Sequence, residues 1–275
     1  MGIGRAAAAV AIGIVGTGLL TACDWGAATE SFSDSDDLAQ PVTSVRFAND
    51  SGAVTIRTGD TASVKREVHY GDEKPGTTFR VKDGVLQLDS CDKRNCWIDY
   101  DVTVPEGTTV TGQLDSGAAN ISGVAEATVR SSSGQVTVED VAGAVKVEAD
   151  SGEVTLADIG GSVVAKADSG SIQADNVRGD VTLEASSGEV QARGIGGATK
   201  VDAQSGSVLV ALTTAQNVRV DAQSGDVDVT VPAGSYAVST STDSGDVTSD
   251  IDNDAAGEHR LDLHTDRGSI TVSRA

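Results

Sequence analysis

The sequence is poor in aromatic residues and in proline. Aromatic residues make up 3% of its 275 residues, and there are only 4 prolines. A core without large rings must be filled by Val, Ile, Leu and Ala, which favours a narrow stack of strands over a globule packed around aromatic side chains. The scarcity of proline argues against a proline-rich disordered chain, and 32 glycines indicate many tight turns.

Positive charge is also scarce. The chain has 20 Lys and Arg against 41 Asp and Glu, which gives a formal net charge of −21. Such a surface repels DNA, RNA and anionic lipid, so no nucleic-acid partner is expected. The acidity keeps an exposed stack of strands soluble, and the functional alternative is weak collection of divalent cations.

Residue types that carry catalysis are sparse. The three histidines are His69, His259 and His264. The last two lie near Asp262 and Asp266, but their spacing is odd for one face of a strand, so we interpret them as surface histidines. No nucleophile elbow is present and the mature chain suggests no helix. We therefore expect no catalytic residue, no metal ligand and no cofactor.

The N-terminus predicts a bacterial lipoprotein signal peptide over residues 1–22. Arg5 supplies the positive charge, residues 6–20 are apolar, and Leu20, Thr21, Ala22 and Cys23 resemble a lipobox. Small residues fit the peptidase, and the Cys23 thiol would carry a diacylglyceryl thioether. The predicted location is the cell membrane, lipid-anchored and facing away from the cytoplasm. The alternatives are a plain secretory signal or an uncleaved anchor.

Two further features follow the signal. Residues 23–41 are polar and acidic without apolar periodicity, which predicts a flexible tether. Cys91 and Cys96 are the only other cysteines, and in an exported chain this pair predicts a disulfide. Because alternating segments flank it, we expect the disulfide to staple a hairpin tip. Free or redox-active thiols are the alternative.

A Ser-Gly pair, followed by an alternating apolar run, returns about every eighteen residues. The glycines are at 117, 134, 152, 170, 188, 206, 225, 245 and 268, although Arg replaces Ser before the last. A fixed period of this size is typical of a solenoid.

Each unit divides into two halves that alternate apolar and polar residues, which predicts two strands. Val154 and Leu156 exemplify the inward set of the first half, and Val181 and Leu183 that of the second. One corner carries an aliphatic residue, such as Ile159. The other carries Ala, a polar pair and Gly.

These patterns predict an all-β, single-domain parallel β-solenoid. We expect about nine coils of ~18 residues over residues 112–275, with two parallel sheets face to face. Open ends of such a stack need caps, and residues 42–111 form the predicted N-terminal β cap because they hold Phe47, Phe79, Trp97 and Tyr100. The charged C-terminal coils would close the other end.

The chain resembles the bacterial putative-adhesin family of β-solenoid domains. The resemblance rests on the strand DSGAVTI from Asp50, on VTVPEGTTV from Val102, and on the Ser-Gly units. It implies a cell-surface solenoid without known enzymatic activity, and it supplies no catalytic residues. Some members of the family accompany envelope-stress systems, so a sensing or protective role is also implied.

We therefore predict a non-enzymatic, lipid-anchored surface protein that binds a protein or a cell-wall polymer. The alternative is an accessory or sensory module of an envelope-stress or membrane regulatory system. A polysaccharide-active β-helix enzyme is a weaker hypothesis, since the loops are short and Tyr236 is the only aromatic residue after Tyr100. Calcium-binding nonapeptide repeats are disfavoured because the turn Gly and Asp of that motif are missing.

Overall fold

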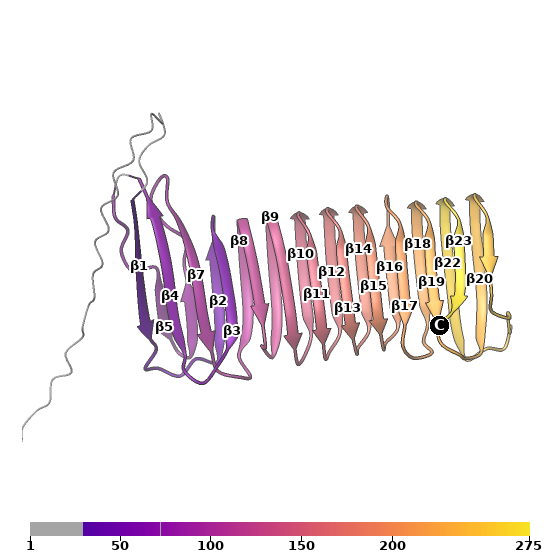
Figure 1. The fold of residues 1–275 in the computed structure, drawn as a ribbon, viewed down its shortest axis with the longest axis horizontal. Helices are drawn as coiled ribbons and strands as arrows, with labels where there is room; N and C mark the ends of the chain where they lie inside the picture. Colours follow the sequence, from indigo (N-terminus) through magenta and orange to yellow (C-terminus); the bar gives the residue numbers. More distant parts are fainter. Residues whose placement is uncertain (1–29, 72) are drawn as a thin grey trace, which may run out of the picture.

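The computed structural model describes residues 30–71 and 73–275, so the signal peptide and Cys23 lie outside the described residues. The described residues form 23 strands and no helix. The strands stack into a long rod in which each coil adds one strand to each of two ladders (Figure 1). The predicted parallel β-solenoid is confirmed.

Parallel pairs build the body of the rod. Strands β8 (Thr109–Ser122) and β9 (Glu126–Val141) each run through both ladders. After them the chain alternates between the ladders. The first ladder continues with β10 (Val145–Ser151), β12 (Val163–Ser169), β14 (Val181–Ser187), β16 (Thr199–Ala203) and β18 (Val218–Ser224). The second continues with β11 (Val154–Ile159), β13 (Ile172–Val177), β15 (Val190–Ile195), β17 (Val208–Leu212) and β19 (Val227–Val231).

The register aligns equivalent repeat positions, so identical positions form columns. Val145 pairs with Val163 and Val163 with Val181, while Val154 pairs with Ile172. All of these residues are buried, as are the alanine and aliphatic corners, represented by Ala167 and Ile159. The core is thus a set of aliphatic columns between two ladders, as the period-two pattern predicted.

The coil order inverts at the C-terminal end. After β19 the chain forms β20 (Tyr236–Ser244) and β21 (Val247–Ser249), and then β22 (His259–Arg267) and β23 (Ile270–Arg274). Strand β22 pairs with both β18 and β20, so the last coil in sequence inserts before the outermost one. The expectation that the C-terminal sequence closes the rod is wrong, because β20 and β21 lie at its end (Figure 1).

The N-terminal end contains the same inversion. Strands β2 (Ser44–Asn49) and β3 (Ala53–Thr58) pair with β8 on one side. On the other side they pair with the later strands β6 (Val85–Leu88) and β7 (Trp97–Val104). The chain therefore skips one coil between β7 and β8, and again between β19 and β20.

A shared local sequence marks both skips. Val104 and Val231 each begin the pattern Val-Pro-x-Gly followed by Thr or Ser. The Pro carbonyls accept hydrogen bonds from nearby hydroxyls, at 2.7 Å from Thr108 Oγ1 to Pro105 and at 3.0 Å from the Tyr236 hydroxyl to Pro232. Since proline ends ladder pairing, this turn suits a strand that must leave its own coil.

Antiparallel strands cover the N-terminal end of the rod. Strand β4 (Ser63–Tyr70) pairs with β7, and β5 (Phe79–Lys82) pairs with β6. Strand β1 (Glu30–Asp37) pairs with β4 over its full length. The prediction of a flexible tether over residues 23–41 is therefore wrong for residues 30–37. The Arg66 and Tyr70 side chains hold this acidic segment through hydrogen bonds to the Asp34 and Glu30 carboxylates. Because such contacts need no alternation of apolar residues, the sequence shows no sign of a strand here.

Candidate functional site

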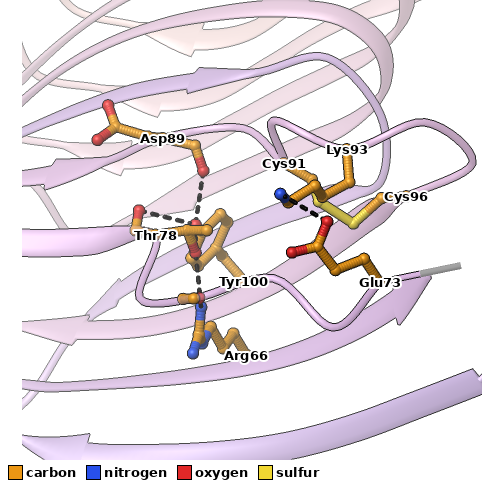
Figure 2. Close-up of a disulfide and its surroundings, with 9 residues drawn as sticks. Arg66, Glu73, Thr78, Asp89, Cys91, Lys93, Cys96 and Tyr100 are labelled. Atoms are coloured by element: carbon orange, nitrogen blue, oxygen red, sulfur yellow. Dashed lines mark hydrogen bonds and ion pairs between the residues drawn. A yellow bond between two sulfur atoms is a disulfide. The ribbon is translucent and has the colours of Figure 1, made fainter.

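The predicted disulfide joins Cys91 to Cys96. It lies in the connection between β6 and β7 (Figure 2). These strands do not pair with each other, since β6 pairs with β2 and β7 with β3. The disulfide therefore closes the corner of a coil, at the place where other coils have Ser-Gly, and the expectation of a hairpin tip is wrong. The Lys93 ammonium and the Glu73 carboxylate form an ion pair at 3.1 Å beside this corner.

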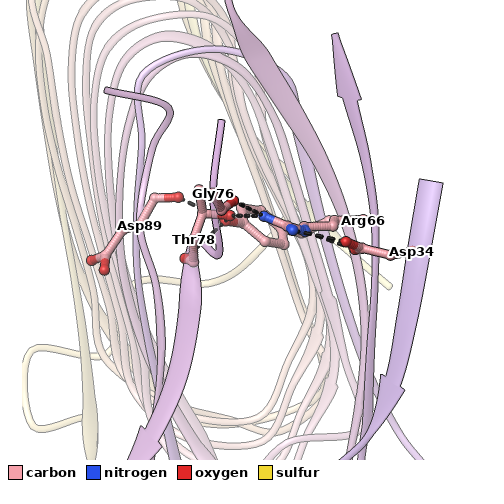
Figure 3. A network of polar contacts seen from close by, with 6 residues as sticks. Asp34, Arg66, Gly76, Thr78 and Asp89 are labelled. Carbon is pink, nitrogen blue, oxygen red and sulfur yellow. Dashed lines mark hydrogen bonds and ion pairs between the residues drawn. The ribbon is translucent and has the colours of Figure 1, made fainter. Parts of the chain in front are cut away.

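A buried arginine seals the N-terminal end of the core. The Arg66 guanidinium donates two hydrogen bonds to the Asp34 carboxylate on β1, each at 2.7 Å, and others to the Gly76 carbonyl and Thr78 hydroxyl at 2.9 and 2.8 Å (Figure 3). The rings of Phe32 and Phe79 lie 5.5 and 5.6 Å from the guanidinium carbon. The hydrogen bond to Asp34 is the main cause that raises the pKa of Arg66.

Tyr100 extends this network into the core. Its hydroxyl oxygen lies 2.6 Å from Thr78 Oγ1 and 2.7 Å from the Asp89 carbonyl oxygen (Figure 2). Burial of the ring raises the pKa of Tyr100 to about 12. The Arg66, Thr78 and Tyr100 side chains leave no buried polar atom without a hydrogen-bond partner, so the network covers the end of the aliphatic columns and has a structural role.

The first ladder presents a face of paired charges. We define this paired-charge face by the outward side chains of the first ladder, Arg130, Lys146, Glu148, Lys166, Glu184, Lys200, Asp202, Arg219 and Asp262. Arg130 and Lys146 contact Glu148 at 2.7 and 2.8 Å. Hydrogen bonds from Lys146 and Arg130 lower the pKa of Glu148 to about 2. Further pairs join Lys166 to Glu184, Lys200 to Asp202 and Arg219 to Asp262.

The second ladder presents a different surface. We define its polar face by the in-register outward residues Asn120, Thr137, Thr155, Gln173 and Gln191. These side chains repeat at the spacing of the strands, about 4.8 Å. The amides are held in place, since Gln173 Nε2 donates to Asp175 at 2.6 Å and Gln191 Nε2 donates to Glu189 at 2.7 Å. The face is thus a straight row of uncharged hydrogen-bonding groups bordered by carboxylates.

One histidine cluster was missed by sequence reasoning. Ser241 Oγ lies 2.8 Å from His264 Nδ1, and His264 Nε2 lies 3.1 Å from Asp266 Oδ1. The inversion of the end coils brings Ser241 and His264 together, and nothing in their sequence spacing indicates it. The His264 and Asp266 side chains are 39% and 50% exposed on the outward side of the ladder. A nucleophilic serine also needs donors for an oxyanion, and β22, which carries His264, already pairs on both edges, with β18 and with β20.

The sequence of residues 42–273 matches the family described as Toastrack DUF4097. The chain belongs to the Toastrack DUF4097 family. No curated protein matches the chain. Among the residues that the structure describes, no helix could span a membrane, and no group of three or more His, Cys, Asp or Glu could hold a metal ion.

Solved structures similar to this Toastrack chain carry adhesion names. A putative adhesin from Bacteroides fragilis has 12% identity and a TM-score of 0.44, with 90% of this chain and 97% of that chain covered. One from Parabacteroides merdae has 11% identity and a TM-score of 0.38, with 89% and 96% covered. A putative cell adhesion protein from Clostridium sporogenes has 11% identity and a TM-score of 0.28, with 90% and 100% covered.

Proposed function

We propose that the protein is a non-enzymatic binding scaffold, anchored by lipid at Cys23 on the outside of the cell, and that its polar face binds a hydroxyl-rich cell-wall polymer. The observation that carries the proposal is the in-register row from Asn120 to Gln191. Ser, Thr, Asn and Gln side chains both donate and accept hydrogen bonds. A row with a constant spacing suits a partner that is itself a repeating chain.

The paired-charge face is less suited to this role. Its outward side chains are charged rather than uncharged, and its cations and anions neutralise one another at close distance. Each exposed ion pair contributes only about 0–1 kcal/mol, so this face serves solubility and register. An accessory or sensory module for a membrane regulatory system would use the same scaffold with a protein partner.

The anchor would orient the rod. Seven peptide steps separate Cys23 from Glu30, and such a segment spans at most ~25 Å. Strand β1 lies at one end of the rod and β20 at the other (Figure 1). The N-terminal cap would therefore be close to the membrane, with the polar face extending away from it.

Two experiments test the proposal. Replacement of Cys23 by Ala should release the protein from the membrane fraction or leave it as unprocessed precursor, and unchanged fractionation would refute lipid anchoring. Incubation of the mature chain with isolated cell wall and with solubilised envelope proteins tests the partner. Retention by the wall supports the proposal, whereas retention by a protein alone supports the module hypothesis.

A further inference from the structure

The outermost coil of the rod has an open edge. Strand β20 pairs with β22, and β21 pairs with β23. No other described residue pairs with the outer edge of either strand as part of the sheet. An open edge of this kind is a template for another strand.

The hydrogen bonds identify which backbone groups point outward. The carbonyls of Ser244 and Asp246 accept from Gly268 and Ile270, and the Asp250 amide donates to Val272. Even-numbered residues of this segment therefore face β23. Because successive residues alternate in direction, the amide and carbonyl groups of Val247 and Ser249 point away from the sheet.

The chain covers part of this edge with its own loop. The Asp254 amide donates to the Tyr236 carbonyl at 2.9 Å, and the Val238 amide donates to Asn253 Oδ1 at 3.0 Å. By the same alternation, Thr240 and Thr242 present the next outward groups on β20. The loop thus pairs with the outward backbone groups at the start of β20, and it leaves those of the rest of β20 and of all of β21 without a partner strand among the described residues.

An apolar column also ends at this edge. One column of inward side chains runs from Val227 through Ile270 to Val247, which is its outermost member and is 45% exposed. It is the one large hydrophobic residue that is exposed among the described residues. Neighbouring columns instead end in the polar residues Thr240, Thr242 and Ser249. An added strand would cover Val247 and continue its column.

The charge around the edge is of one sign. Between Tyr236 and His259 the sequence contains no Lys or Arg. The exposed acidic residues of this segment form no ion pair with another described residue, and they are Asp243, Asp246, Asp250, Asp252, Asp254 and Glu258. On the first ladder in the middle of the rod, cations accompany the carboxylates, and Glu148, Glu184 and Asp202 are each paired with one.

We infer that the edge of β20 and β21 is a docking site for an extended, basic segment of a partner protein, which adds to the rod as a further strand. Main-chain hydrogen bonds to Val247 and Ser249 would provide affinity, and cationic side chains would pair with the surrounding carboxylates. A second copy of this chain is a poor occupant, because edge-to-edge contact would bring the same unpaired carboxylates together. The inference uses residues outside the polar face and does not depend on the proposed function.

A capped peptide in which Lys alternates with Val and Thr is the probe, and its Glu-for-Lys counterpart is the control. The Lys peptide should bind the mature chain and the Glu peptide should not, as measured by calorimetry. Replacement of Asp243 and Asp246 by Asn should weaken binding about fivefold, which corresponds to two exposed charge pairs. The matched variant replaces Asp150 by Asn and Glu153 by Gln, the same repeat positions in mid-rod, and should bind as the wild type does.

The variant Val247→Pro tests the backbone contact. Its amide points outward, so proline removes no ladder hydrogen bond, and the thermal transition should be unchanged while peptide binding is lost. Absence of binding by the Lys peptide would overturn the inference, as would equal weakening in both charge variants. A wild-type dimer that Val247→Pro abolishes would identify a second copy as the occupant and would also overturn it.

Discussion

The change Gly170→Ala tests the corner geometry that stacks the coils. Gly170 lies in the column of Ser-Gly corners, with φ of 137°. An added Cβ would lie 1.9 Å from the carbonyl oxygen of Gly152 in the preceding coil, whereas real Cβ atoms essentially never approach closer than 3.0 Å. The corner would have to move by about 1 Å, which is the difference between these two distances.

The backbone cannot move freely, because hydrogen bonds fix it on both sides. The Gly170 amide donates to the carbonyl oxygen of Ser187 at 3.0 Å, and the Gly152 amide donates to the carbonyl oxygen of Ser169 at 3.0 Å. A backbone conformation of this kind costs a non-glycine residue about 1–3 kcal/mol on its own. Together with distortion of two ladders, we expect a loss of about 4 kcal/mol in the free energy of unfolding.

Gly107→Ala is the matched control. Gly107 has φ of 81°, and an added Cβ would meet no atom within 4 Å. This variant contains the strain of a positive φ without the clash, so it should lose only about 1–2 kcal/mol. Urea unfolding of both variants, followed by circular dichroism, measures the difference. Equal losses in the two variants would refute the stacked-corner geometry.

Two further predictions concern the N-terminal cap. The raised pKa of Tyr100 means that the unfolded chain loses this proton first, so stability should be unaffected below pH ~10 and fall by about 2–3 kcal/mol as the pH rises to ~12. Tyr100→Phe should remove this part of the fall in urea titrations across that range, and an unchanged fall would contradict the burial of the hydroxyl. Joint replacement of Cys91 and Cys96 by Ser should cost about 2 kcal/mol, because the closed loop is short. Dithiothreitol should destabilise the wild type equally and leave the variant unaffected, and a loss above ~4 kcal/mol would mean that the disulfide does more than close its loop.

The repeat made the body of the fold predictable. Each coil uses the same local pattern, so the burial of Val154 and Leu156 and the outward position of Thr155 follow from alternation alone. The corners are equally local, since an alanine such as Ala167 precedes the polar pair and Gly in each coil from Ala149 to Ala222. The disulfide could be predicted because Cys91 and Cys96 had no other partner in the mature core.

The ends of the rod were not predictable by the same reasoning. Coils with the same pattern can stack in any order, so alternation could not place β22 before β20. Strand β1 was missed because Asp34 and Glu30 hold it through side chains on β4, and such contacts leave no period. The contact between Ser241 and His264 was missed because it depends on the order in which the coils stack.

Assignment of binding to the polar face is the central claim for function. The most direct test is retention of the mature chain by isolated cell wall, compared between two double variants. One replaces Gln173 and Gln191 by Ala on the polar face. The other replaces the in-register pair Thr182 and Lys200 by Ala on the outward side of the first ladder, where the paired-charge face lies. The first should weaken retention roughly tenfold or more, from the loss of two hydrogen-bonding amides, and the second should leave it unchanged. Equal retention of the two variants would contradict the claim.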